Sequence, residues 1–334
     1  MKSKILKILL SFLCVFASQN LLGKNKYKVA YVYGFFEAGS GFNHAAAAGI
    51  EKARKELDVE VIEIKDLSGV KKTKKIMEQA IKDGANLLVS LGFRTNEITA
   101  EIAKAHANNK NVKFAVIDSV VNLPNVASYL FKEHEGSFLA GYAAAKFSQS
   151  GKIGYIGGMP IPPVKRFEAG YMQGAKFANK NIEVISTYLD YTTKNHTIWG
   201  NKKKAKKIAR DLYAKGVDIV YSVAGGSGHG VFDAAKEVKK YAIGVDVNEN
   251  HVVPGRIITS MIKRVDTATY RAIKDAYKNQ DTPGKSLVLG ISEEGVGLAL
   301  DQHSEKIVGK DFINDLKVIR KKIEENEIKV NDKY

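Results

Sequence analysis

Cysteine is nearly absent from this sequence, because the 334 residues contain only Cys14. A single thiol cannot close a disulfide within the chain, and it cannot supply the cysteine clusters of zinc fingers. The seven histidines show no H-E-x-x-H pair, and a complete Walker A phosphate loop is also absent. We therefore expect no metal site and no cofactor, and the sequence gives no sign of a metal- or thiol-dependent enzyme.

Long apolar runs are scarce as well. After residue 23, no segment reaches the ~18 apolar residues that a membrane-spanning helix needs. Residues 1–23 combine a lysine-rich start with the apolar run 8–17, which is typical of a signal peptide cleaved after Ala17. The alternative is an uncleaved N-terminal anchor. We expect export to the periplasm or to the outer face of the cytoplasmic membrane.

Cys14 raises the further possibility of a lipid anchor. Bacterial lipoproteins carry a cysteine after the apolar run, preceded by small residues. Here the bulky Phe12 and Leu13 precede it, which makes a poor lipoprotein motif. If the leader is removed at Ala17, the mature chain contains no cysteine.

Acidic residues are outnumbered, and the formal net charge is +16. The lysines cluster at 71–75 and 202–207, with a smaller basic group at 320–322. We interpret these clusters as solvated helix faces, with attraction to an anionic membrane surface as a further possibility. Nucleic-acid binding is the alternative, but no zinc-finger spacing or basic zipper accompanies the charge, so no nucleic-acid partner is expected.

Short apolar strands alternate with amphipathic helices along the rest of the chain. The predicted strands are 28–34, 60–64, 86–92, 113–118, 126–131, 152–158, 183–189, 218–224, 241–246 and 256–262, with helices between them such as 43–57 and 71–83. Nearly continuous apolar strands that alternate with helices indicate parallel sheets covered on both faces. The fold class is therefore α/β.

The strand–helix pattern occurs twice. KVAYVYG at 28 matches KIGYIGG at 152, DGANLLVSLG at 83 matches KGVDIVYSVAGG at 215, and KFAVID at 113 matches KYAIGVD at 240. Three pairs in the same order predict two doubly wound parallel-sheet lobes joined by a hinge. We assign 27–125 to lobe 1, completed by about 260–282, and 126–259 to lobe 2, completed by about 283–330. Ligands of such sheets bind outside the carboxyl ends of the strands, here in the cleft between the lobes.

Charged residues follow strands at matching positions of the two lobes. Asp118 ends KFAVID, Asp246 ends YAIGVD, and Lys263 follows IITSMI. Two carboxylate acceptors suit a ligand rich in hydroxyl donors, such as a sugar or a ribose. The alternative for each aspartate is a purely structural role as a helix N-cap or in a turn. The alternative for Lys263 is an ordinary surface position. A catalytic carboxylate pair is a third possibility, but no acid–base partner lies nearby.

Two aromatic residues are candidates for stacking on a planar ring. Trp199, the sole tryptophan, lies in the polar stretch KNHTIWGNKKK, and Phe42 lies in the glycine-rich turn GSGFNH of the other lobe. Rings from opposite lobes could sandwich a heterocycle, although core packing is the alternative for each. The run GGSGHG at 225–230 fits neither a nucleophile elbow nor a dinucleotide fingerprint, and we interpret its glycines as allowing a close backbone approach to ligand.

Several ordered blocks resemble the basic membrane protein family of bacterial lipoproteins, the purine nucleoside receptors of ABC transporters. The blocks run from about residue 28 to 300 and are GFN (41–43), FAVID (114–118), FLAGYAAAKFSQSGKIGYIGG (138–158), FEAGYMQGAK (167–176), VAGGSGHGVFDAAKE (223–237), AIGVDVN (242–248), ITSMIKRVD (258–266) and EEGVGL (293–298). The resemblance implies the type I periplasmic-binding-protein fold and binding without catalysis.

The resemblance also implies roles for individual residues. It implies that Phe42 and Trp199 stack on the base, that Asn43 contacts the edge of the base and that the backbone of Gly226 approaches the ligand closely. It also implies that Asp118, Asp246 and Lys263 bind the ribose. The chain departs from the family pattern where an aspartate that helps hold the base edge is replaced by Gly39, and where Asp-Gln is replaced by Asn248-Glu249. The first departure leaves the preferred base open.

These observations predict an exported receptor, not an enzyme, that captures a purine nucleoside in its cleft. The expected partners are the permease and ATPase of an ABC transporter, and the protein is expected to be a monomer associated with the membrane through the permease or a lipid anchor. Two carboxylates beside one lysine disfavour a phosphate, so a neutral nucleoside fits better than a nucleotide. The alternatives are another ring-bearing or sugar-like solute on the same fold, and a nucleoside-processing enzyme.

Overall fold

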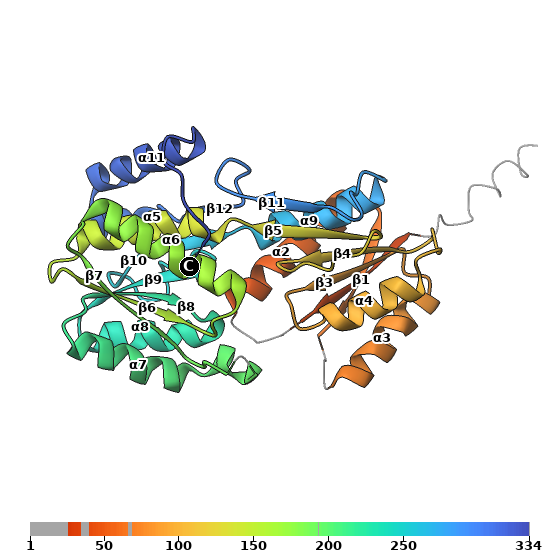
Figure 1. The fold of residues 1–334 in the computed structure, drawn as a ribbon, viewed down its shortest axis with the longest axis horizontal. Coiled ribbons are helices and arrows are strands. Elements are labelled where there is room, and N and C mark those ends of the chain that lie inside the picture. The colour runs from red at the N-terminus through yellow and green to blue at the C-terminus, as the bar shows by residue number, and fades with distance from the viewer. Residues whose placement is uncertain (1–25, 35–39, 66–68, 193, 334) are drawn as a thin grey trace, which may run out of the picture.

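The computed structural model describes residues 26–34, 40–65, 69–192 and 194–333, and two lobes lie side by side in it (Figure 1). Each lobe is built on one six-stranded sheet. The leader, with Cys14 and Ala17, lies outside the described residues, as does Gly39. Within the described ranges, no helix is both long and apolar enough to cross a membrane.

The sheet of lobe 1 has the strand order β11-β5-β4-β3-β1-β2, and every neighbouring pair in it is parallel. Its strands are β1 (Tyr27–Tyr33), β2 (Val59–Ile64), β3 (Leu87–Leu91), β4 (Lys113–Ile117), β5 (Val126–Phe131) and β11 (Ser286–Leu289). The carboxyl ends of β1, β3 and β4 therefore meet at one edge of the sheet.

The sheet of lobe 2 has the equivalent order β12-β10-β9-β8-β6-β7. Its strands are β6 (Lys152–Gly157), β7 (Glu183–Tyr188), β8 (Ile219–Val223), β9 (Tyr241–Asp246), β10 (Ile257–Lys263) and β12 (Val296–Leu298). Only the short edge strand β12 runs antiparallel to its neighbour β10 among the described pairs. The matching orders confirm the two similar lobes that the sequence repeat predicts.

Helices cover both faces of each sheet (Figure 1). In lobe 1 they are α2 (Gly41–Glu56) and α9 (Val265–Tyr277) on one face, and α3 (Val70–Lys82) and α4 (Asn96–Ala105) on the other. In lobe 2, α5 (Glu133–Phe147) and α6 (Pro162–Ala178) lie on one face, and α7 (Lys202–Ala214) and α8 (Gly228–Glu237) on the other. The remaining helices are η1 (His196–Gly200), η2 (Gly225–Ser227), α10 (Gln302–Val308) and α11 (Lys310–Glu324).

The strand β1 shows why these apolar runs form buried strands. Successive side chains of a strand point to opposite faces of the sheet. Val29 and Tyr31 pack in the core beneath α2 and α9, whereas Ala30 and Val32 pack in the core beneath α3 and α4. Because both faces are covered, polar residues cannot alternate with apolar ones, and the run is apolar throughout.

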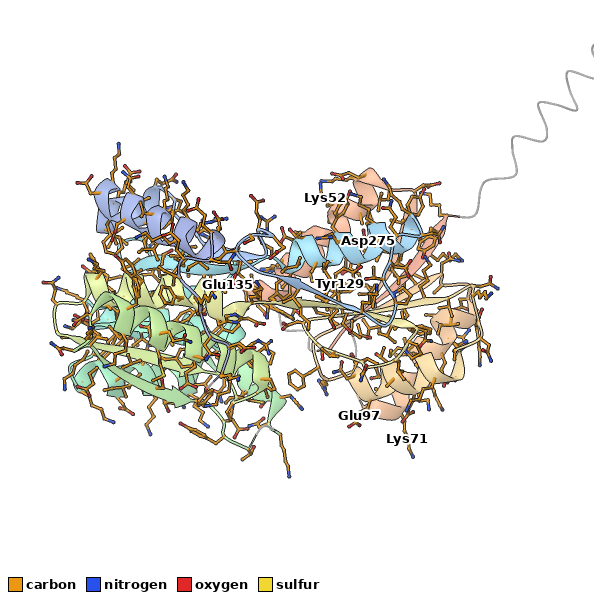
Figure 2. The ribbon with its side chains drawn as sticks, turned by 45° about the horizontal axis from the view of Figure 1, so that its top comes forward. Lys52, Lys71, Glu97, Tyr129, Glu135 and Asp275 are labelled. Atoms are coloured by element: carbon orange, nitrogen blue, oxygen red, sulfur yellow. The ribbon has the colours of Figure 1, made fainter. Side chains whose placement is uncertain are left out.

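All ten predicted strands are present, with ends that differ by at most one residue, but the sequence patterns missed β11 and β12. The predicted lobe boundaries need correction. Residues 126–131 were assigned to lobe 2, yet β5 pairs with β4 and β11 in the sheet of lobe 1. The hydroxyl of Tyr129 in β5 also donates to Asp275 of α9 at 3.3 Å (Figure 2).

The C-terminal completions are corrected in the same way. Lobe 1 was expected to regain the chain from about 260 to 282, and α9 does pack there, but β10 continues in the sheet of lobe 2 as far as Lys263. The segment 283–330 was assigned to lobe 2, whereas β11 pairs with β5 of lobe 1. The chain consequently crosses between the lobes three times, after β5, after β10 and after β11.

Candidate functional site

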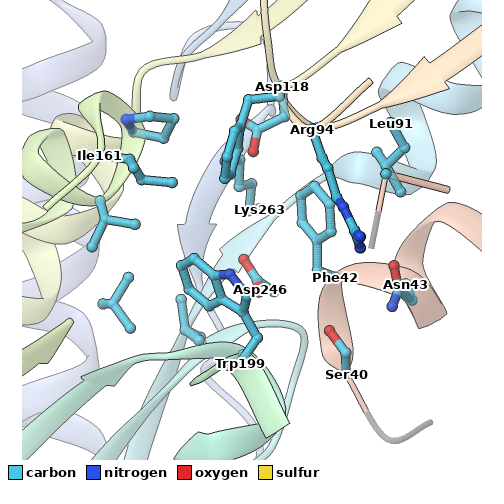
Figure 3. Close-up of a pocket in the computed structure, with 18 of the residues that line it drawn as sticks. Ser40, Phe42, Asn43, Leu91, Arg94, Asp118, Ile161, Trp199, Asp246 and Lys263 are labelled. Carbon is cyan, nitrogen blue, oxygen red and sulfur yellow. The ribbon is translucent and has the colours of Figure 1, made fainter. Parts of the chain in front are cut away.

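A pocket lies between the lobes at the carboxyl ends of their strands (Figure 3). It encloses about 850 Å³ of empty space, open solvent at its mouth included. It is lined by Gly34, Ser40, Phe42, Asn43, Leu91, Gly92, Phe93, Arg94, Asp118, Ile161, Pro163, Val164, Phe167, His196, Trp199, Val223, Gly225, Val245, Asp246 and Lys263. Both lobes thus contribute to one cleft, as their topology requires.

The first turn of α2 forms one wall of this pocket. Helix α2 begins at Gly41, so Phe42 and Asn43 are helical and do not belong to the turn that the glycine-rich sequence predicts. A Cβ atom on Gly41 would lie 2.7 Å from Cγ2 of Val247 and 3.6 Å from Cβ of Asp246. A glycine at this position allows the start of α2 in lobe 1 to pack directly on the end of β9 in lobe 2.

The two aspartates follow equivalent strands and share an unusual backbone conformation. Asp118 has a φ of 62° and Asp246 a φ of 69°, both in the left-handed region. This region costs a non-glycine residue of the order of 1–3 kcal/mol and is found where function demands a particular side-chain direction. Neither residue caps a helix, so the helix N-cap interpretation is wrong for both. Both carboxylates point into the pocket (Figure 3).

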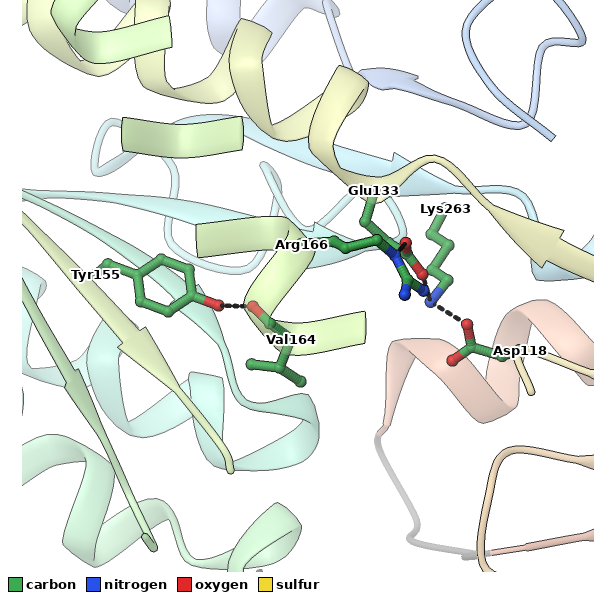
Figure 4. A network of polar contacts seen from close by, with 6 residues as sticks. All are labelled: Asp118, Glu133, Tyr155, Val164, Arg166 and Lys263. Carbon is green, nitrogen blue, oxygen red and sulfur yellow. Dashed lines mark hydrogen bonds and ion pairs between the residues drawn. The ribbon is translucent and has the colours of Figure 1, made fainter. Parts of the chain in front are cut away.

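Lys263 joins charges from both lobes (Figure 4). Its Nζ lies 2.6 Å from Oδ1 of Asp118 and 3.0 Å from Oε1 of Glu133, and Nε of Arg166 donates to Oε2 of Glu133 at 2.7 Å. The side chains of Lys263 and Glu133 are 2% and 0% exposed, so the surface interpretation of this lysine is wrong. Because Lys263 ends β10 and Glu133 begins α5, this charge network lies beside two of the three crossings between the lobes.

Aromatic rings surround the same ammonium group. Nζ of Lys263 lies 5.7 Å from the ring centroid of Phe42, 5.0 Å from that of Phe131 and 5.3 Å from that of Phe167. These distances are within the range of cation–π attraction. The rings hold the ammonium in a fixed position and also exclude water from the charge network.

Burial and neighbouring charges compete in setting the pKa values of the network. Burial raises the pKa of Asp118 to about 6, against the opposing effect of Lys263, and it raises the pKa of Asp246 to about 6 for the same reason. Burial alone would lower the pKa of Lys263, but Asp118 and Glu133 outweigh it and hold that pKa above its ordinary value. Glu133 has a lowered pKa, because Lys263 and Arg166 outweigh burial. At neutral pH three carboxylates therefore face two cations.

Trp199 lies on η1 of lobe 2, held in place by polar contacts at both sides of the ring. Asn195 caps the helix by accepting from the backbone N–H of Thr197 at 3.2 Å, and the hydroxyl of Ser227 donates to the carbonyl of Ile198 at 2.5 Å. The indole packs flat against Gly158, where a Cβ would lie 2.3 Å from Cζ3 of the ring. The rest of the ring is open to the pocket, on the side opposite to Phe42 (Figure 3).

Six of the seven residues predicted for the site lie together in this pocket: Phe42, Asn43, Asp118, Trp199, Asp246 and Lys263. Gly226 is buried and does not appear in the lining, whereas the neighbouring Gly225 does. Gly225 has a φ of 55° and lies next to Trp199. A Cβ atom added to Gly225 would lie 3.6 Å from Cε3 of the indole.

Sequence reasoning missed four residues of the site. Arg94 follows β3, and the rule that ligands bind after strands could have found it. Glu133 is the first residue of α5, and Arg166 and Phe167 lie in the second turn of α6; no local pattern distinguishes them from the other charged and aromatic residues of those helices. Tyr155 fixes the start of α6 by donating to the carbonyl of Val164 at 2.8 Å (Figure 4).

In the part of the chain that the structure describes, no group of three or more histidine, cysteine, aspartate or glutamate side chains is arranged to hold a metal ion. The pocket instead offers two carboxylates, one ammonium, one guanidinium, an amide and several rings.

Comparison with known proteins gives consistent matches along nearly the whole chain. A family model described as "ABC transporter substrate-binding protein PnrA-like" matches residues 26–334. Basic membrane protein D of Borreliella burgdorferi strain JD1 is 33% identical over 328 residues, which cover 95% of this chain and 92% of that protein. Basic membrane protein A of Borreliella burgdorferi strain B31 is 31% identical over 336 residues, which cover 93% and 95% of the two chains.

Among solved structures, a solute-binding protein of an ABC transporter system from Aeropyrum pernix K1 is similar throughout. The TM-score is 0.79 at 28% sequence identity, and the match covers 92% of this chain and 94% of that one. A sugar transporter from Clostridium phytofermentans shares the fold at 17% identity, with a TM-score of 0.59. The predicted type I periplasmic-binding-protein fold is thereby confirmed.

Proposed function

The chain belongs to the family of PnrA-like ABC transporter substrate-binding proteins, and we propose that it captures a purine nucleoside between its lobes. In this proposal the protein is an exported receptor that delivers the nucleoside to the permease of an ABC transporter. It acts by binding, with no chemical change to the ligand.

The charge network is suited to a ribose. Asp118 and Asp246 offer acceptors from the two lobes, and Lys263 adds donors between them. Vicinal hydroxyl groups both donate and accept, so they can satisfy a carboxylate and an ammonium at the same time. The excess of carboxylates over cations around this end of the pocket disfavours a phosphate or a carboxylate ligand.

The aromatic rings are suited to a planar base. Phe42 comes from lobe 1 and Trp199 from lobe 2, and both line the pocket beside the charge network (Figure 3). A base between two rings gains offset stacking worth about 0.5–1.5 kcal/mol per pair beyond its burial. Because one ring belongs to each lobe, a bound base also joins the lobes.

One observation carries this proposal: two aspartates from opposite lobes, one of which bonds a buried lysine, line the same cleft as two aromatic rings from opposite lobes. A simple sugar would use the aspartates but not both rings, and a free base would use the rings but not the aspartates. A nucleoside uses all of them.

The proposal is tested by identifying and then measuring the ligand. The mature protein, purified without added nucleoside, is denatured and the released small molecules are analysed by mass spectrometry. Isothermal titration then compares guanosine, inosine and adenosine with ribose and myo-inositol. We expect a nucleoside to be released and to bind at least about 10-fold more tightly than either sugar, since the base adds stacking and burial.

Two outcomes would contradict the proposal. Tighter binding of ribose or myo-inositol than of all three nucleosides would assign the site to a sugar-like solute. Release of free hypoxanthine from inosine during incubation with the protein would make it an enzyme.

A further inference from the structure

Arg94 gives the pocket a second polar end that the proposed ribose contacts do not use. It follows β3 in the segment Gly92-Phe93-Arg94, all of which lines the pocket. In Figure 3 its guanidinium lies beside Phe42 and points toward Asn43, away from the carboxylates of Asp118 and Asp246. We propose that Arg94 makes this receptor selective for 6-oxopurine nucleosides, guanosine and inosine, over adenosine. This inference rests on the proposed nucleoside function.

The two polar ends of the pocket fix which edge of a base meets Arg94. A ribose held by Asp118, Asp246 and Lys263 brings the glycosidic nitrogen of the base to that end. The base then lies beside Phe42, and the edges of the ring system remote from the sugar face the other polar end. On a purine these edges carry the ring nitrogen N1, the substituent at position 6 and the ring nitrogen N7, and position 6 with N7 forms the edge that carries two acceptors in a 6-oxopurine.

The chemistry of arginine decides between the substituents. A guanidinium has five donors and no acceptor, and it remains charged throughout the physiological pH range. Guanine and hypoxanthine present two acceptors, O6 and N7, which an arginine contacts with two parallel hydrogen bonds. Adenine keeps only N7 as an acceptor on this edge, and its amino donor at position 6 faces the guanidinium donor to donor, so the two parallel hydrogen bonds cannot form.

The remaining polar groups at this end do not cancel that preference. Asn43 has an amide that both donates and accepts, so it can serve either kind of purine. The hydroxyl of Ser40 is equally adaptable. Among the described residues that line the pocket, the only carboxylates are Asp118 and Asp246, at the far end. Within the described lining, adenine therefore meets no side chain at this end that is restricted to accepting, whereas the 6-oxopurines meet one that is restricted to donating.

The charge of Arg94 also suits a neutral 6-oxo group better than an amino group. The carbonyl dipole of O6 directs its negative end at the guanidinium, which strengthens a hydrogen bond to a charged donor. The exposed position of Arg94 lets it contact a base without first leaving a buried site. Its neighbour Phe93 contacts His196 of lobe 2, with ring centroids 5.8 Å apart, so the two lobes touch beside Arg94.

The test is isothermal titration of the mature protein and two variants with guanosine, inosine, adenosine and guanosine 5′-monophosphate. Arg94→Met removes the donors and keeps the aliphatic stem. Arg210→Met is the matched control, because Arg210 is exposed on α7, outside the pocket. We expect the wild-type protein to bind guanosine and inosine about 10-fold or more tightly than adenosine, as a bidentate arginine contact implies.

We expect Arg94→Met to weaken guanosine and inosine by about 10-fold and to leave adenosine within about 3-fold, so that the preference disappears. Arg210→Met should keep the wild-type preference. Thermal unfolding without ligand verifies that each variant is folded. If Arg94→Met does not fold, Arg94→Lys replaces it, since lysine keeps the charge but loses the two parallel hydrogen bonds.

The outcomes separate this inference from the proposed function. If no nucleoside binds the wild-type protein, the proposed function fails and the inference falls with it. Adenosine binding as tightly as guanosine, or an equal loss of all three nucleosides in Arg94→Met, overturns the inference and leaves the nucleoside function standing. Tighter binding of guanosine 5′-monophosphate than of guanosine, lost in Arg94→Met, also overturns it, because Arg94 would then contact a phosphate.

Discussion

Single residues set the chemistry of the cleft, and Asp118 illustrates how. Its carboxylate is 12% exposed, it accepts from Lys263 at 2.6 Å, and its backbone is held in the left-handed region. A strained backbone and a buried carboxylate both lower the stability of the folded protein, so the stability of the fold does not explain an aspartate here. The position is explained by its direction into the pocket, where the carboxylate is available to a ligand.

We predict that Asp118→Ala lowers nucleoside affinity by about 10-fold or more, as expected for the loss of a charged acceptor. Isothermal titration measures the change. Asp211→Ala is the control, because Asp211 is exposed on α7, outside the pocket. Unchanged affinity in Asp118→Ala would remove this residue from the site.

Glu249 is a buried acid behind the site. It occupies the position of the glutamine in the Asp-Gln pair of the family pattern. Its Oε2 accepts from the backbone N–H of Val245 at 2.9 Å, one residue before Asp246. Burial, reinforced by Asp246, raises the pKa of Glu249 to about 8. At neutral pH it is protonated and has nearly the shape and hydrogen-bonding capacity of glutamine.

We predict that Glu249→Gln stabilises the protein increasingly from pH 5 to pH 8.5. The unfolded chain releases this proton near pH 4.5 and the folded chain near pH 8, so the wild-type protein loses stability as pH rises between these values. Glutamine does not titrate, and its advantage should reach about 2–4 kcal/mol above pH 8. Urea unfolding at both pH values measures it.

Glu60→Gln is the control for this prediction, because Glu60 is exposed on β2. A pH-independent difference between Glu249→Gln and the wild-type protein would mean that Glu249 is ionised in the folded state.

At the scale of elements, η1 determines whether Trp199 can stack. We predict that Gly158→Ala weakens nucleoside binding by about 3- to 10-fold, the value of one stacking contact, because the new Cβ would lie 2.3 Å from the indole and the ring must move. Trp199 is the only tryptophan, so its fluorescence reports the displacement directly. Titration and the emission maximum are measured together.

Gly297→Ala on β12 serves as the control, since its Cβ would meet no atom closer than Nη1 of Arg320 at 3.6 Å. Unaltered fluorescence and affinity in Gly158→Ala would show that Trp199 is not positioned by this glycine.

The elements also show what a sequence can and cannot predict. Ten strands could be predicted because each is a continuous apolar run, and their order follows from the repeat. The membership of β5 and β11 could not, since pairing between residues 126–131 and 286–289 depends on contacts distant in the sequence. The three- and four-residue strands β12 and β11 are also too short for a periodic pattern.

The same contrast holds for the site. Asp118, Asp246 and Lys263 could be predicted because they directly follow strands at matching positions. Glu133 and Arg166 could not, because they belong to helices whose burial against the hinge is a tertiary property. Which glycine of the run lines the pocket could not be predicted either, because it depends on the short helix η2 that begins at Gly225.

At the scale of the whole molecule, the charge network and the crossings between lobes coincide. Lys263 bonds Asp118 of lobe 1 and Glu133 of lobe 2, and it ends the strand from which one crossing departs. A ligand on Lys263 and on both aspartates therefore acts on the lobes and on the hinge at once.

We predict that a saturating nucleoside reduces the radius of gyration measured by small-angle X-ray scattering, because the ligand favours the closed arrangement of the lobes. At 100 times the dissociation constant it should also stabilise the folded protein by about 2.7 kcal/mol, seen as a higher melting temperature. Asp118→Ala at the same ligand concentration is the control. Compaction in that variant without bound ligand would contradict the mechanism.

The position of β11 has a consequence for how the protein is made. Lobe 1 starts at β1, but its outermost strand comes from Ser286–Leu289, after nearly all of lobe 2. A growing chain holds an unfinished first sheet, with the edge of β5 open, until this late segment has been synthesised. Pairing Phe131 with Leu289 closes a very long loop, which slows folding more than it lowers stability. Lobe 1 therefore cannot complete its sheet before this late segment is available.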